Sequence, residues 1–120
     1  MLTIMIIDED SAMRELLEEW LLADGYRVVG YPAGKDLRDA GIDLVIIDVP
    51  SLRVQGFDTV RKAQEANPLA EVIGMSTQLG QSLGQHSPAA HSLGVRRLLA
   101  KPCGRDELLG AVVEAIGRPL

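Results

Sequence analysis

Acidic, hydroxyl and amino side chains follow short apolar runs in this chain, and together they could carry out chemistry on a phosphoryl group. Residues 8–10 read Asp-Glu-Asp after a first run, and Asp48 ends a later one. Ser76 and Lys101 end two further runs. Carboxylates that lie close together repel unless one is protonated or a cation is bound, and an all-oxygen site with few protein ligands suits Mg²⁺. With a lysine and a hydroxyl nearby, these acids predict a carboxylate nucleophile for phosphoryl transfer.

Apolar runs that read as buried strands alternate with segments of helical period. The strands are expected at residues 2–7, 27–31, 44–47, 72–75 and 97–100. Helices are expected from Ser11 to a stop at Gly25 and over residues 32–40, 56–66 and 106–116, the second having room for only about two turns. Strands separated by helices imply a doubly wound parallel sheet covered on both faces. Ligands bind beyond the carboxyl ends of such strands, where the chemical side chains would converge.

Local signals predict how two of these helices begin and pack. Ser11 is expected to cap the first helix. The apolar face of that helix is expected to contain Met13, Leu16, Leu17, Trp20 and Leu21. In the third helix, Phe57, Val60 and Ala63 are expected to point inward.

Length and composition exclude several classes of protein. The chain has 120 residues, which predicts one domain over residues 1–120. A net charge of −5 makes it a poor non-specific nucleic-acid binder. Cys103 is the only cysteine, which excludes an internal disulfide and fits a reducing, cytoplasmic location. No apolar run reaches the roughly 18 residues of a membrane span, so no membrane contact is expected.

The order and spacing of these motifs resemble a response-regulator receiver domain of a two-component system, over nearly the whole chain. The residues that carry the resemblance are Ile-Ile-Asp-Glu-Asp at 6–10, Leu-Val-Ile-Ile-Asp at 44–48, Gly56, Ile-Gly-Met-Ser at 73–76, Gly94 and Leu-Ala-Lys-Pro at 99–102. The resemblance implies a flavodoxin-like α/β fold with five parallel strands in the order 2-1-3-4-5 and helices on both faces.

The resemblance also implies roles for single residues. Asp48 would accept a phosphoryl group from a sensor histidine kinase or a phosphotransfer protein. Ser76 would be the switch hydroxyl, and Lys101 would neutralise a phosphoryl oxygen, aimed by a cis bond before Pro102. Mg²⁺ would be held by Asp8, Glu9, Asp48 and the Pro50 carbonyl.

The same resemblance implies a signalling switch that is not a turnover enzyme. Thr77 and Leu98 would belong to the output side of the switch. Its partner would be a downstream protein or a fused output domain, with no direct contact to nucleic acid.

Four departures from the family pattern stand out. Leu52 replaces the usual proline four residues after the phosphoacceptor, and Pro50 removes one possible N–H donor to a phosphoryl group. Leu98 occupies the position of the usual aromatic switch residue. The segment over residues 77–91 is rich in Gly, Ser and Gln, which predicts a mobile loop before a short helix from Ser87-Pro88 to Gly94. The expected helix over residues 32–40 is short.

Other interpretations stay open at this stage. A degenerate receiver would keep the fold as a phosphate-independent interaction module, as Pro50 and Leu98 suggest. Asp8 and Asp10 also resemble the Asp-x-Asp motif of haloacid-dehalogenase-like phosphatases, although Asp48 would then be unexplained. Arg96 and Arg97 are expected on a solvated strand edge or at a partner contact, and Cys103 in the apolar interior.

Overall fold

The computed structural model describes residues 2–31, 41–50, 52, 54–84 and 86–119. Its strands are β1 (Thr3–Ile7), β2 (Arg27–Tyr31), β3 (Leu44–Asp48), β4 (Glu71–Ser76) and β5 (Arg97–Ala100). Its helices are α1 (Ser11–Ala23), α2 (Val54–Ala66), α3 (Pro88–Leu93) and α4 (Arg105–Ile116). The strand expected at residues 2–7 therefore begins one residue later, and the third expected helix begins two residues earlier.

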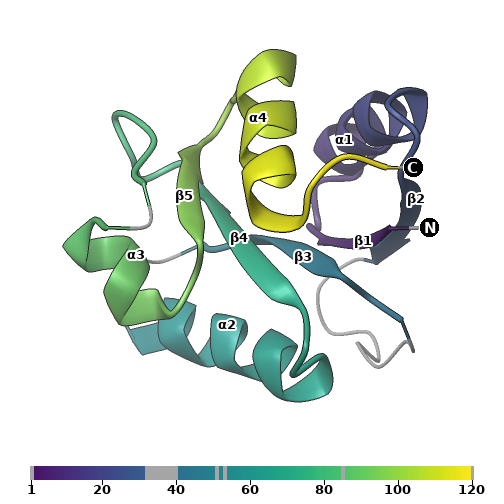
Figure 1. The fold of residues 1–120 in the computed structure, drawn as a ribbon. Helices are drawn as coiled ribbons and strands as arrows, with labels where there is room; N and C mark the ends of the chain where they lie inside the picture. The colour runs from purple at the N-terminus through teal and green to yellow at the C-terminus, as the bar shows by residue number, and fades with distance from the viewer. Residues whose placement is uncertain (1, 32–40, 51, 53, 85, 120) are drawn as a thin grey trace.

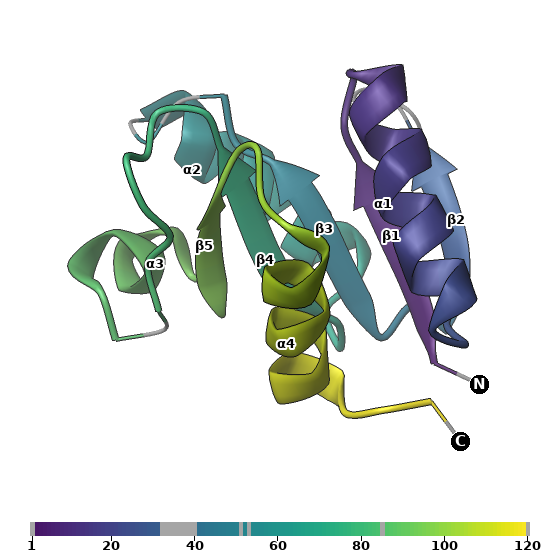
Figure 2. The same cartoon turned by 90° about the horizontal axis from the view of Figure 1, so that it is seen from above.

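The five strands form one parallel sheet in the order β2-β1-β3-β4-β5. Helices α1 and α4 cover one face, and α2 and α3 cover the other (Figures 1 and 2). The predicted doubly wound fold and its strand order are confirmed. All parallel strands run the same way, so their carboxyl ends meet at one edge of the sheet.

The strands are apolar on both faces because each face is covered by helices. Side chains alternate along a strand, so Ile4 and Ile6 of β1 pack towards α1 and α4, whereas Met5 and Ile7 pack towards α2 and α3. Cys103 is buried in the first of these clusters, as predicted. Two apolar layers, one on each face of the sheet, therefore hold the strands in place.

Some predictions for the cap of α1 and for the inward faces of α1 and α2 are wrong. Asp10, not Ser11, caps α1, because its carboxylate accepts a hydrogen bond from the backbone N–H of Met13 at 3.1 Å. Leu16 and Phe57 each remain 39% exposed. The inward faces of α1 and α2 are therefore narrower than their apolar periodicity predicts.

The short helix α3 confirms one prediction from an irregular segment. Ser87 caps it by accepting a hydrogen bond from the N–H of Ala90, and Pro88 occupies its first turn. Gly94 ends it with a φ of 74°, in the left-handed region that favours glycine. The helix predicted over residues 32–40 lies outside the described residues.

Candidate functional site

Lys101 is the centre of the candidate site at the carboxyl ends of the strands. Its Nζ donates hydrogen bonds to Asp8 Oδ2 at 2.9 Å and to Asp48 Oδ1 at 3.2 Å. Asp8 follows β1, Asp48 ends β3 and Lys101 follows β5. One ammonium group thus joins Asp8 and Asp48, which lie 93 and 53 positions before Lys101 in the sequence.

Asp8 is held from several sides. Its side chain is 4% exposed, and Oδ1 accepts a hydrogen bond from the N–H of Asp10 at 2.9 Å. Arg14, one turn into α1, donates to the Asp8 carbonyl. Hydrogen bonds therefore fix the orientation of Asp8 in the acidic turn between β1 and α1, and one of its carboxylate oxygens is directed at Lys101.

Asp48 opens onto a small pocket. Its side chain is 29% exposed, and the pocket has a volume of about 170 Å³. The residues that line it are Ile7, Asp8, Glu9, Asp48, Pro50 and Thr59. A small oxygen-rich ligand can therefore reach Asp48 from solvent.

Asp48 and Lys101 shift each other's pKa in opposite directions. Burial raises the pKa of Asp48 above 3.8, and the carboxylates of Asp8 and Asp10 add to this rise, while Lys101 opposes it. Burial acts to lower the pKa of Lys101, but its hydrogen bonds and charge attraction to Asp8 and Asp48 outweigh burial and raise it. Lys101 therefore stays cationic while Asp48 carries its charge at an energetic cost.

Ser76 lies at the same edge and is completely buried. Its Oγ accepts a hydrogen bond from the N–H of Gln78 at 3.1 Å, and its carbonyl accepts one from the N–H of Lys101 at 2.9 Å. Gln78 Oε1 in turn accepts a hydrogen bond from the N–H of Leu52 at 3.2 Å. Thr77, between them, is exposed. The end of β4 is thus connected both to Lys101 and to the loop after Asp48.

Leu98 lies on β5, where it pairs with Gly74 of β4. Its side chain is completely buried, and a Cβ added to Gly74 would lie 2.9 Å from Leu98 Cδ2. Glycine at position 74 therefore makes room for the leucine that replaces the usual aromatic residue. The bond between Lys101 and Pro102 is cis, as the resemblance implies.

The chemistry of the donor set fits a hard divalent cation. Asp8, Glu9, Asp48 and the carbonyl of Pro50 offer only oxygen, which Mg²⁺ prefers. Among the described residues, no three acidic, histidine or cysteine side chains already converge on one point, and Glu9 is exposed. A magnesium ion here would use few protein ligands and keep several waters.

Three contributors to the site were missed by sequence reasoning. Thr59 of α2 lines the pocket, Arg14 holds the Asp8 carbonyl, and Gln78 contacts Leu52. The side chain of Asp10, by contrast, is used as a helix cap. Thr59 and Gln78 carry no distinctive spacing, whereas Arg14 could have been found as the first basic residue on the helix after the acids.

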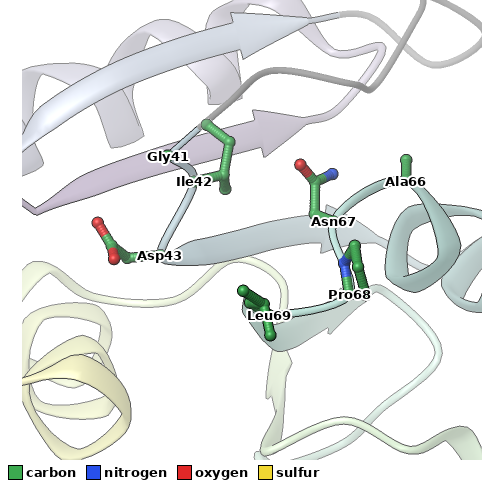
Figure 3. Close-up of a pocket in the computed structure, with 7 residues that line it drawn as sticks. All are labelled: Gly41, Ile42, Asp43, Ala66, Asn67, Pro68 and Leu69. Atoms are coloured by element: carbon green, nitrogen blue, oxygen red, sulfur yellow. The ribbon is translucent and has the colours of Figure 1, made fainter.

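A second pocket lies at the opposite end of the sheet (Figure 3). It has a volume of about 350 Å³ and is lined by Gly41, Ile42, Asp43, Ala66, Asn67, Pro68 and Leu69. It brings together none of the predicted site residues. The larger pocket is therefore not the candidate site.

The fold and the site together define a doubly wound α/β domain with an acidic site at the carboxyl edge of its sheet. The family model described as "Response regulator receiver domain" matches residues 4–113. The chain belongs to this family. Such domains are components of two-component response regulators and generally act as signalling proteins rather than enzymes.

Individual relatives agree with this assignment. The transcriptional regulatory protein CpxR of Escherichia coli (strain K12) is 28% identical over 114 residues, which cover 91% of this chain and 47% of CpxR. The chain spans about half the length of the curated relatives that it matches.

In the part of the chain that the structure describes, we find no helix with the length and apolarity to span a membrane.

Solved structures show the same fold. A response regulator receiver domain protein from Methanospirillum hungatei JF-1 superposes with a TM-score of 0.78 at 21% identity, covering 97% of this chain and 94% of that one. Response regulator protein TrrA of Thermotoga maritima, in complex with Mg²⁺-BeF, has a TM-score of 0.74 at 23% identity and covers 96% and 99%.

Proposed function

We propose that this receiver domain, over residues 1–120, accepts a phosphoryl group on Asp48 with the help of Mg²⁺. The observation that carries the proposal is the bridge made by Lys101 Nζ, 2.9 Å from Asp8 and 3.2 Å from Asp48. It places a cation beside the solvent-accessible carboxylate and next to a second, fixed acid. The donor would be a sensor histidine kinase or a phosphotransfer protein.

In the proposed reaction, an oxygen of Asp48 attacks phosphorus, and the bond from phosphorus to the donor's leaving group breaks with its electron pair going to that group. Bound Mg²⁺ would neutralise charge on the phosphoryl oxygens. Lys101 stays protonated and moves from pairing with Asp48 to pairing with a phosphoryl oxygen, while Asp8 keeps it in place. Positioning and charge neutralisation account for most of the catalysis in such transfers.

Ser76 would carry the signal away from Asp48. Its hydroxyl now accepts a hydrogen bond from Gln78, and a rotation towards the phosphoryl group would remove that bond. Thr77 and the following residues would then be released from the end of β4. The recipient would be a downstream protein or a fused output domain.

The test is phosphorylation by acetyl phosphate with Mg²⁺, followed by intact mass. The wild type is expected to gain one phosphate, and Asp48→Asn none. Asp58→Asn, which changes an acid of α2 paired with Arg61, is the matched control and should label like the wild type. An unmodified wild type, or equal labelling of Asp48→Asn, would falsify the proposal.

A phosphate-independent interaction module is the second candidate. It is favoured by Leu98, which is completely buried and has no aromatic ring to move, and by Pro50, which has no N–H for a phosphoryl oxygen. A wild type that stays unlabelled under the same conditions would support this candidate.

A further inference from the structure

Residues 77–84, here called the cover segment, run beside the outer edge of β5. Within it Leu83 pairs antiparallel with Leu98 of β5. The N–H of Leu83 donates to the Leu98 carbonyl at 2.7 Å, and the N–H of Leu98 donates to the Leu83 carbonyl at 2.9 Å. An edge strand otherwise presents such groups unpaired.

Ser82 extends this pairing by one step. Its Oγ accepts a hydrogen bond from the N–H of Ala100 at 2.9 Å and donates one to Glu107 Oε1 of α4, also at 2.9 Å. The side chains of Leu79 and Leu83 pack against the apolar cluster that contains Leu98. The outer edge of β5 is thus occupied by a short extended peptide, with polar and apolar contacts that alternate.

Two glycines flank the paired residues without a local need for glycine. A Cβ added at Gly80 or Gly84 would meet no atom within 4 Å, and neither has a φ in the left-handed region. Glycine lowers stability through the entropy of the unfolded chain when its conformation needs no glycine. The conformational freedom of these glycines would serve a second arrangement, in which residues 81–83 leave β5.

We propose that the outer edge of β5 is a strand-addition site for an extended segment of a partner protein, and that residues 81–83 occupy it as an internal ligand. The groups that a partner strand would bind are the N–H and carbonyl of Leu98 and the N–H of Ala100, which lie beside an apolar cluster. The fitting partner is therefore an antiparallel strand with an aliphatic residue in the place of Leu83 and a hydroxyl residue in the place of Ser82. No step needs phosphorylation of Asp48, so this site is independent of the proposed function.

The test uses a blocked hexapeptide copying residues 79–84, Leu-Gly-Gln-Ser-Leu-Gly, added to the ¹⁵N-labelled chain. In the double variant Ser82→Ala/Leu83→Gly, the internal ligand is weakened. The peptide should then give saturable shifts of the Leu98 and Ala100 amides. The wild type should bind about tenfold more weakly, because its own segment competes for the edge.

Two controls keep this outcome specific. Gln81→Ala changes an exposed residue of the same segment and should bind like the wild type, and a peptide with Asp in the place of Leu83 should not bind. The Arg96 amide, which donates to the Val72 carbonyl at 2.7 Å on the β4 side, should stay protected and shows that the sheet is intact. The proposal is overturned if the double variant shows no saturable shifts with the peptide. It is also overturned if sedimentation shows that the double variant self-associates, with its copies joined through β5.

Discussion

The site around Lys101 and the cover segment on β5 are held together in opposite ways. The charged side chains of Asp8 and Lys101 are only 4% and 10% exposed, and the two residues follow strands that are distant in sequence. The cover segment is polar and largely exposed, and it contacts β5 mainly through the backbone of Leu83 and the hydroxyl of Ser82. The contacts of the first region depend on the identity of its side chains, whereas those of the cover segment depend mainly on the position of its backbone.

This difference has an energetic consequence. Placing like charges in a partly buried site costs free energy that only a cation or a ligand offsets, so Asp8 and Asp48 depend strongly on Lys101. The bonds of the cover segment are few and close to solvent, and each contributes about 1 kcal/mol net. The charged site should therefore respond steeply to substitution and the cover segment weakly.

The largest effect is expected from Lys101→Met. Removing the cation that faces both Asp8 and Asp48 should slow phosphorylation by acetyl phosphate by roughly a hundredfold, the scale seen when one charge-stabilising donor is lost. The measurement is the initial rate of labelling with Mg²⁺. Lys62→Met, at an exposed position of α2, should leave that rate unchanged.

The contrast between the two regions would disappear if Lys101→Met were labelled at a rate within a factor of about two of the wild type. Such a factor corresponds to roughly 0.4 kcal/mol in activation free energy. Circular dichroism of both variants checks that the fold is retained.

The next effect is expected from Gly74→Ala, at the point of β4 that lies between the two regions. The new Cβ would be 2.9 Å from Leu98 Cδ2 and 3.1 Å from Val49 Cγ2. Overpacking of this kind lowers the free energy of unfolding by about 1–3 kcal/mol. Urea unfolding measures it.

Gly110→Ala is the matched control for this glycine. Gly110 lies on α4, and a Cβ there would meet no atom within 4 Å. Alanine should stabilise this helical position by roughly 0.5–1 kcal/mol. Equal effects of the two substitutions would contradict the packing described between Gly74 and Leu98.

The same contrast explains what could be predicted from the sequence. Strands and their acidic ends were predictable, because an apolar run predicts a buried strand and the acid that follows it, Asp8 or Asp48, marks the carboxyl end of that strand. The pairing of Leu83 with Leu98 was not predictable, because backbone hydrogen bonds leave no signature in residue type. Ser11 was wrongly expected to cap α1, because serine and aspartate both favour the N-cap position and only the geometry shows that Asp10 occupies it.

Asp48→Asn should raise stability in a pH-dependent way. Because burial raises the pKa of Asp48 above 3.8, the folded state binds more protons than the unfolded state between these two values. The stability contribution of Asp48 is thus present below pH 3.8 and lost as pH rises through the folded-state pKa. At neutral pH the asparagine variant should be the more stable protein.

This gain should be smaller than the loss in Gly74→Ala, because a side chain that is 29% exposed is partly screened by solvent. The measurement is urea unfolding of both proteins at pH 7 and near pH 3.5. A gain that grows towards acid pH has the wrong sign and would contradict the charged, partly buried state of Asp48.

The smallest effect is expected from Ser82→Ala, which changes the cover segment alone. The N–H of Ala100 and the carboxylate of Glu107 each lose one hydrogen-bond partner, but water can replace the serine at this partly exposed position. The free energy of unfolding should therefore fall by only about 0.5–1 kcal/mol. Amide exchange of Leu98 and Ala100 should nevertheless accelerate, because local opening of the segment precedes unfolding. Unchanged exchange at both amides would mean that the segment is as firmly held as the charged site, and the contrast between the two regions would disappear.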